Sequence, residues 1–242
     1  GTGTGGQVSV VTKSGSNLWR GSIFEYYRDD ALDAPNYFDS TRNADASVIV
    51  ELPKSNLNQH QFGRSFGGPI VKDKVFFFGS YEGYRLDAGV NFVEASPSDA
   101  AWARAVPAVQ PLRAGFVAPG AVLIPGVSTN ADYDIFQLQG LEQVDENSFS
   151  MRLDYRMSQQ WSSYVRVFND RGEQLRPEGI SGRVVRVKNE PTNAIFNLQG
   201  TFGSGLLNEF KVGYNGPKTS AVAFGSAGYD PIGISLSGTV TS

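Results

Sequence analysis

The chain has 242 residues, a formal net charge of −3 and no cysteine. The small negative charge gives no electrostatic case for nucleic-acid binding, and the lack of cysteine removes disulfides, zinc fingers and thiol catalysis. Glycine contributes 28 residues and aromatic side chains 12% of the chain, which favours β structure. No run of eighteen apolar residues occurs, so a transmembrane helix is excluded.

The chain opens with a glycine-rich lead, GTGTGG at positions 1–6. A phosphate-binding loop would require a following Gly-Lys-Ser/Thr and a helix, and neither follows. Residues 7–12 predict a short strand, and 13–17 predict a turn. Because there is no initiating methionine and no signal peptide, we expect an internal fragment or a processed product.

Seven further segments have the composition and alternating polarity of β-strands. The clearest alternation is in 148–157, where Phe149, Met151, Leu153 and Tyr155 share one face and the residues between them are polar. The predicted strands are approximately 19–28, 59–70, 74–85, 148–157, 161–170, 194–202 and 206–214.

Long and short connections alternate between these strands. The short ones are 71–73, 158–160 and 203–205, and the long ones are 29–58, 87–145 and 171–192. In an up-and-down antiparallel sheet, alternate turns lie on opposite rims, so one rim carries only tight turns. Outer-membrane barrels have this asymmetry, with short periplasmic turns and long extracellular loops. The alternative is an ordinary sheet that packs one face against a water-excluded core.

The long connections carry weaker signals. In 87–145 we expect one helix, with Ser96 as the N-cap, Pro97 in the first helical position, Asp99 in the first turn and 100–106 as its body. The tail from 216 to 242 has no clear strand signal until its end. Asp30, Asp33, Asp39 and Asp45 raise the possibility of a calcium site, although their spacing is not that of an EF-hand and solvated carboxylates are the favoured interpretation.

Polar residues on three predicted strands form a candidate wall that contacts a solute or another part of the protein. The alternative is mutual salt bridging without a role in binding. The candidates are Arg152, Asp154, Arg156, Arg166, Asn197 and Gln199. His60 is the only histidine, no G-x-S-x-G motif is present, and we predict no catalytic site, no metal site and no cofactor.

Three stretches resemble TonB-dependent outer-membrane receptors. GGQVSVVTKSGSN at 5–17 resembles the end of their plug domain, and WRGS with FEY at 19–26 resembles the first barrel strand. NQ at 58–59, QFG at 61–63 and GGPIVKDKVFFFGSYEGYR at 67–85 are similar to barrel strands two and three of the large Oar-like branch. NEFKVGY at 208–214 is similar to a later strand of that branch.

This resemblance implies that residues 1–17 are the C-terminal end of a plug domain and that 18–242 are the N-terminal part of a large β-barrel with long extracellular loops. It implies a fragment of a bacterial outer-membrane transporter that takes up a solute, with energy supplied through the TonB complex. The expected partners are outer-membrane lipid, the TonB complex through parts absent from this chain, a solute of unknown identity, and further strands or chains that close the sheet. The alternative is a surface binding or adhesion protein that uses the same barrel and loops without transport.

Overall fold

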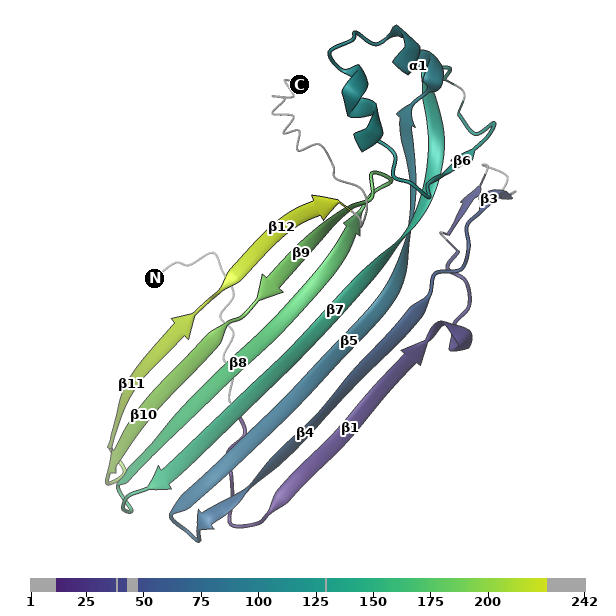
Figure 1. The fold of residues 1–242 in the computed structure, drawn as a ribbon. Coiled ribbons are helices and arrows are strands. Elements are labelled where there is room, and N and C mark those ends of the chain that lie inside the picture. Colours follow the sequence, from purple (N-terminus) through teal and green to yellow (C-terminus); the bar gives the residue numbers. More distant parts are fainter. Residues whose placement is uncertain (1–11, 38, 43–47, 129, 226–242) are drawn as a thin grey trace.

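A single antiparallel sheet dominates the computed structural model, which describes residues 12–37, 39–42, 48–128 and 130–225. The sheet has ten strands, and its main path runs β1-β4-β5-β7-β8-β10-β11 (Figure 1). These strands are β1 (Arg20–Asp29), β4 (Leu57–Val71), β5 (Val75–Pro97), β7 (Tyr133–Arg156), β8 (Trp161–Glu178), β10 (Thr192–Phe202) and β11 (Leu206–Gly216). The expected all-β, up-and-down architecture is confirmed.

The remaining elements lie away from the short-turn rim. β6 (Val122–Ile124) pairs with β7, and β9 (Arg183–Asn189) lies between β8 and β12 (Thr219–Gly225). A separate two-stranded sheet joins β2 (Ser40–Arg42) to β3 (Val48–Glu51). The helical elements are η1 (Asp30–Leu32), α1 (Asp99–Arg104) and η2 (Gln110–Gly115). Within the described residues, no helix has both the length and the apolar character needed to cross a membrane.

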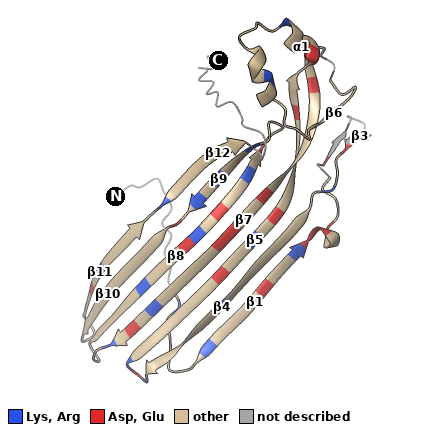
Figure 2. Ribbon diagram, viewed as in Figure 1, with Lys and Arg blue, Asp and Glu red and all other residues tan. Residues whose placement is uncertain are grey.

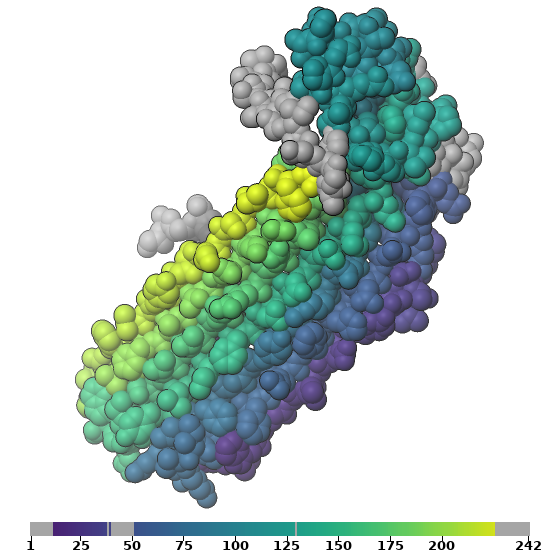
Figure 3. Space-filling model, in the orientation of Figure 1, coloured from purple at the N-terminus to yellow at the C-terminus, as the bar shows by residue number. Residues whose placement is uncertain are grey.

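Connection length separates the two rims in part. The short-turn rim is as the sequence predicts, but the predicted long connection 171–192 is mostly strand, since β8 continues to Glu178 and pairs with β9 after a turn at 179–182. The tight turns between β4 and β5, β7 and β8, and β10 and β11 lie together at the lower left of Figure 1, and the long connections lie at the opposite end. Figure 3 shows the same order as adjacent bands of colour from purple to yellow. Along the main path the strands therefore lie in the order in which they occur in the chain.

Several predicted connections contain more strand than expected. β5 continues to Pro97 and β7 begins at Tyr133, because the two strands pair with each other along this whole length. The predicted 87–145 connection is therefore shorter than expected. β12 was also missed, since its strand signal depends on pairing with β9, where Thr219 lies opposite Asn189.

The expected helix exists, but its predicted N-cap is wrong. Ser96 lies opposite Asp134 and Pro97 opposite Tyr133 in the sheet, so neither is available to start a helix. Ser98 is the N-cap instead, and its Oγ accepts a hydrogen bond from the Ala101 N–H at 3.1 Å. Asp99 does occupy the first turn, as predicted.

The two faces of the sheet differ in chemistry. Register places Phe77, Leu153, Val165, Phe196 and Val212 side by side on one face. The same face carries Phe149 at 46% exposure and Met151 at 47%, a high exposure for adjacent apolar side chains. We call this the apolar face; contiguous apolar surface of this kind requires a non-aqueous neighbour. Glu25 and Arg64 near the β1 edge are charged exceptions on it.

Aromatic rings cover glycines on adjacent strands. A Cβ on Gly63 would lie 2.6 Å from the Phe24 ring, and one on Gly83 would lie 2.5 Å from the Phe62 ring. Glycine is therefore required at both positions for the rings to lie flat against the sheet. Such cross-strand pairs help to fix the register of β1, β4 and β5.

We predict that the long-connection rim is outside the cell. In the full-length protein, a cysteine replacing the exposed Ala108 should react with an impermeant thiol reagent in intact cells, and one replacing Gln159 should react only after the outer membrane is permeabilised. Reaction at Gln159 but not at Ala108 in intact cells would reverse the orientation.

We also predict that the apolar face meets lipid. Leu153→Arg should destabilise the full-length protein by roughly 2–4 kcal/mol, the cost of a lipid-facing arginine near the bilayer midplane. Ser150→Arg is the control, since Ser150 lies on the opposite face beside a cavity of about 350 Å³. Unfolding in guanidinium from detergent micelles measures both; equal losses would contradict the assignment of faces.

Candidate functional site: a polar wall and the N-terminal segment

All six predicted wall residues lie on the polar face of the sheet, opposite the apolar face. Arg152 on β7 is directly opposite Arg166 on β8, and Asp154 is opposite Tyr164. On β10, Asn197 is opposite the same Tyr164. Arg156 and Gln199 complete this surface, because both lie opposite Ser162. The sheet register therefore brings these residues together as one surface, which we call the polar wall.

The centre of the polar wall is a half-buried ion pair. The Arg152 Nε donates to both carboxylate oxygens of Asp154 at 3.0 Å, and its Nη2 donates to Oδ1 at 2.7 Å. The two side chains are only 15% and 19% exposed. The Arg152 guanidinium also lies 3.8 Å from the centre of the Tyr164 ring, a cation–π contact that sequence analysis missed. This arrangement fixes the guanidinium in one position.

Three other members of the wall, Arg166, Arg156 and Asn197, have partners of their own. Arg166 donates to the Asn193 Oδ1 at 2.6 Å, and the Arg156 guanidinium lies 5.2 Å from the centre of the Phe76 ring. Asn197 is 2% exposed and donates to the Glu209 Oε1 at 2.7 Å. Many polar groups of the wall therefore have partners within the sheet, as the salt-bridging alternative predicts. Arg152 also contacts a residue outside the sheet.

Arg152 binds the start of the described chain. Its Nη1 donates to the Thr12 Oγ1 at 3.1 Å, a contact 140 residues apart in sequence. Gly15 lies so close to β5 that a Cβ would be 2.4 Å from the Phe77 carbonyl oxygen. Residues 12–17 thus run along the polar face before the chain enters β1 (Figure 1). Of the predicted 7–12 strand, only Thr12 lies within the described residues, and it is not in a strand.

A reciprocal contact holds this segment to the turn between β4 and β5. The Asn17 Nδ2 donates to the Asp73 Oδ1 at 2.5 Å, and the Asp73 N–H donates to the Asn17 Oδ1 at 2.8 Å. Asp73 has φ of 63°, a left-handed conformation that suits aspartate in tight turns. Sequence reasoning placed a turn here but could not pair it with Asn17, since the contact is not local.

Carboxylates lie farther from the short-turn rim on the same face. Glu82, which accepts from the Gln61 Nε2 at 2.6 Å, is opposite Ser148, which is in turn opposite Asp170. The Asp170 Oδ1 is buried without a hydrogen-bond partner. The polar face therefore changes from arginine-rich near the tight turns to acidic farther along the strands.

His60 and the acidic loop take part in ordinary polar contacts. The His60 Nδ1 lies 3.0 Å from the Glu25 Oε1, and its ring packs against Tyr27. Arg28 pairs with Asp33 at 3.1 Å, and Lys54 pairs with Asp30. In the described part of the chain, no group of three or more His, Cys, Asp or Glu side chains could hold a metal ion; Asp45 lies outside those residues.

The amino-acid sequence is similar to that of known outer-membrane proteins. A model described as "Outer membrane beta barrel domain" matches residues 11–241. The TonB-dependent transporter Oar of Myxococcus xanthus is 34% identical over 83 residues, which are 34% of this chain and 7% of that protein. This chain therefore spans a small part of the length of that relative. No solved structure matches.

The half-buried ion pair of the wall should contribute more than an exposed one. We predict that Asp154→Ala lowers the unfolding free energy of the full-length protein by about 1–3 kcal/mol, because it leaves the Arg152 guanidinium without its carboxylate. Lys211→Gln is the control: it removes an ion pair to Glu209 whose partners are 50% and 47% exposed, and should cost less than about 0.5 kcal/mol. Denaturation in guanidinium measures both, and a larger loss for Lys211→Gln would contradict the prediction.

Proposed function

Because the chain belongs to the outer membrane beta barrel domain family and resides in the bacterial outer membrane, we propose that it is part of a TonB-dependent transporter that takes up a solute. The partial similarity to the Oar transporter supports this proposal. The barrel would form the path across the membrane, and energy would come from the TonB complex through parts outside this chain.

The observation that carries this proposal is the segment 12–17 held against the polar wall. In a transporter of this kind, a plug occupies the lumen, and the chain must pass from the plug into the first barrel strand. We propose that residues 1–17 are the C-terminal end of the plug and that 18–242 are the N-terminal part of the barrel. The Arg152–Thr12 and Asn17–Asp73 contacts support this proposal.

On this proposal the polar face lines the lumen. Arg152, Asp154 and Arg156 would be close to the plug, and Arg166, Asn197 and Gln199 would continue the same lumen-facing surface. The lumen is the polar side of an outer-membrane barrel, in agreement with the charges gathered there. We propose no catalytic role and no cofactor for these residues.

The described sheet is open, and this bears on its partners. β1 pairs only with β4 and β11 only with β10. An unpaired strand edge in lipid leaves backbone groups unsatisfied, each at a cost of several kcal/mol. We propose that further strands or other chains close the sheet.

A surface binding or adhesion protein is the second candidate. The region that β5 and β7 carry beyond the other strands, where Trp102 of α1 is buried against Phe116, is compatible with it but does not favour it over transport (Figure 1). A structured surface region suits capture of a partner as well as capture of a solute.

Energy dependence distinguishes the two functions. We predict that cells lacking the gene and cells lacking TonB fail to deplete the same solute from the medium, as measured by comparative metabolite profiling. Restoring the gene should restore depletion only when TonB is present. A surface function that persists without TonB, with no shared solute, would instead establish the binding or adhesion role.

A further inference from the structure

Two charged side chains interrupt the apolar face near its β1 edge. Arg64 on β4 is directly opposite Ile23 on β1 and Tyr81 on β5. Glu25 follows two residues after Ile23 on β1, and side chains two residues apart share a face of a strand. The apolar face therefore carries one cation and one carboxylate, diagonal to each other across β1 and β4.

The level of these charges in the membrane follows from strand geometry. Tyr81 lies six residues beyond Val75, where β5 begins at the tight-turn rim. A strand that rises ~3.3 Å per residue and tilts by ~40° climbs roughly 15 Å over that length. The apolar band of an outer-membrane barrel is about 25 Å tall, so Arg64 lies within the band and not at its edge. Glu25 lies roughly 5 Å higher.

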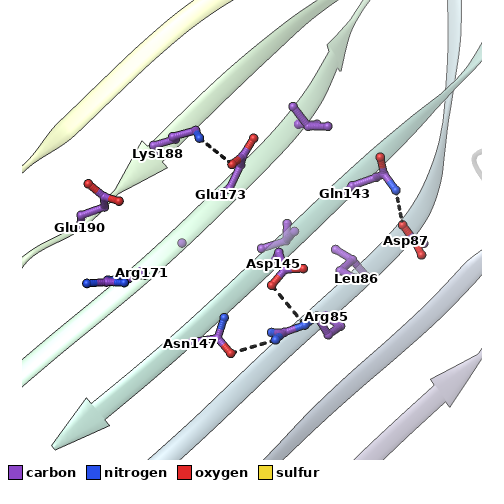
Figure 4. A pocket seen from close by; sticks show the side chains of 13 residues that line it. Arg85, Leu86, Asp87, Gln143, Asp145, Asn147, Arg171, Glu173, Lys188 and Glu190 are labelled. Carbon is purple, nitrogen blue, oxygen red and sulfur yellow. Dashed lines mark hydrogen bonds and ion pairs between the residues drawn. The ribbon is translucent and has the colours of Figure 1, made fainter.

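Other charged side chains of this face are paired with each other. Figure 2 shows charged segments gathered on β7, β8 and β9, toward the long connections. The Arg85 Nε lies 3.1 Å from the Asp145 Oδ1, and the Lys188 Nζ lies 2.9 Å from the Glu173 Oε2 (Figure 4). These charges are neutralised within one chain.

Arg64 has no such partner. Within the described residues its side chain is exposed and makes no hydrogen bond, ion pair or ring contact. Glu25 does not neutralise it, since the Glu25 Oε1 lies 3.0 Å from the His60 Nδ1 instead and the Glu25 side chain is 61% exposed. An arginine at this level is costly where it faces lipid. The surface around Arg64 therefore requires a neighbour that carries a negative charge.

The sheet is hollowed around these two charges. A cavity of about 570 Å³ lies over β1, β4 and β5, and its lining includes Ile23, Glu25, Phe62, Arg64 and Tyr81. We call these five residues the edge patch. Ile23 is 86% exposed, so the patch combines an exposed apolar surface with one charge of each sign. Such a surface has the composition of a protein contact and not of a lipid contact.

We propose that the edge patch is the contact surface between two copies of this protein in the outer membrane. Charge complementarity selects a second copy, because a surface with one cation beside one carboxylate is complementary to itself. In a two-fold contact, if residue i of one copy meets residue j of the second copy, then j also meets i. The Arg64 of each copy then pairs with the Glu25 of the other, and the apolar members of the patch surround both ion pairs.

The geometry of the sheet allows this arrangement. A two-fold axis perpendicular to the membrane keeps every residue at its own level, and the side chain of arginine spans the difference of roughly 5 Å between Arg64 and Glu25. The contact uses the face of β1 and β4, so it leaves the unpaired edge of β1 available to the strand that closes the sheet. This inference rests on residence in the outer membrane and is independent of transport.

Charge reversal in two differently tagged, co-expressed copies of the full-length protein tests the contact. The original copies should copurify from outer membranes extracted in mild detergent. Glu25→Arg in both copies, or Arg64→Glu in both copies, places like charges opposite each other and should lower copurification about tenfold. Arg64→Gln, which adds no charge to the face, should lower it by a smaller factor.

The matched control is Arg28→Glu, which reverses a charge on β1 but on the polar face, where Arg28 pairs with Asp33. It should leave copurification unchanged. Heat-modifiable migration confirms that each variant is folded.

Co-expression of the two reversed variants with each other decides between contact within one chain and contact between copies. A Glu25→Arg copy and an Arg64→Glu copy present opposite charges at both contacts and should copurify as well as the original copies. Each chain alone still carries two like charges, so this recovery requires contact between copies.

Three results would overturn the proposal: original copies that do not copurify, reversed variants that copurify undiminished, or no recovery when the two variants are combined. Loss of a different protein from the purified Arg64→Glu variant would assign the edge patch to that partner and would also overturn it.

Discussion

Backbone hydrogen bonding is the constraint on which the rest of this structure depends. A bilayer provides no water to satisfy N–H and C=O groups, so a strand that crosses it must pair along its whole length with a neighbour on each side. The continuous ladder between β5 and β7, from Val75 opposite Tyr155 to Pro97 opposite Tyr133, meets this requirement on one side of β5 without a register shift. Side chains are then assigned to two faces by the alternation of the strand, and one face becomes mostly apolar.

That constraint explains how much of the fold could be predicted. In 148–157 the alternation needs no tertiary information, because each residue shows its face by its polarity, and the predicted faces agree with the register. The strand ends were harder to place, since adjacent apolar residues, Phe92 with Val93 and Ile135 with Phe136, interrupt the period-two pattern there. β5 therefore extends through Ser96 and Pro97, two residues whose types suggested a helix start, because pairing with β7 outweighs local preference.

The candidate site was predicted in part. Period two was sufficient to place Arg152, Asp154 and Arg166 on one side, but their partners could not be deduced. Thr12 lies 140 residues from Arg152 in sequence, and the role of Tyr164 depends on which strand lies beside β7.

The two contacts that hold residues 12–17 have a mechanical consequence. Any tension applied to the chain before Thr12 is transmitted first to the side-chain bonds Arg152–Thr12 and Asn17–Asp73, and only afterwards to the backbone ladder of β1 and β4. Side-chain bonds of this kind break one at a time, whereas a ladder loaded along its strands resists through many bonds at once. The segment can therefore be detached while the ladder between β1 and β4 stays intact. The Asn17–Asp73 contact is the last one to bear the tension before it reaches the sheet.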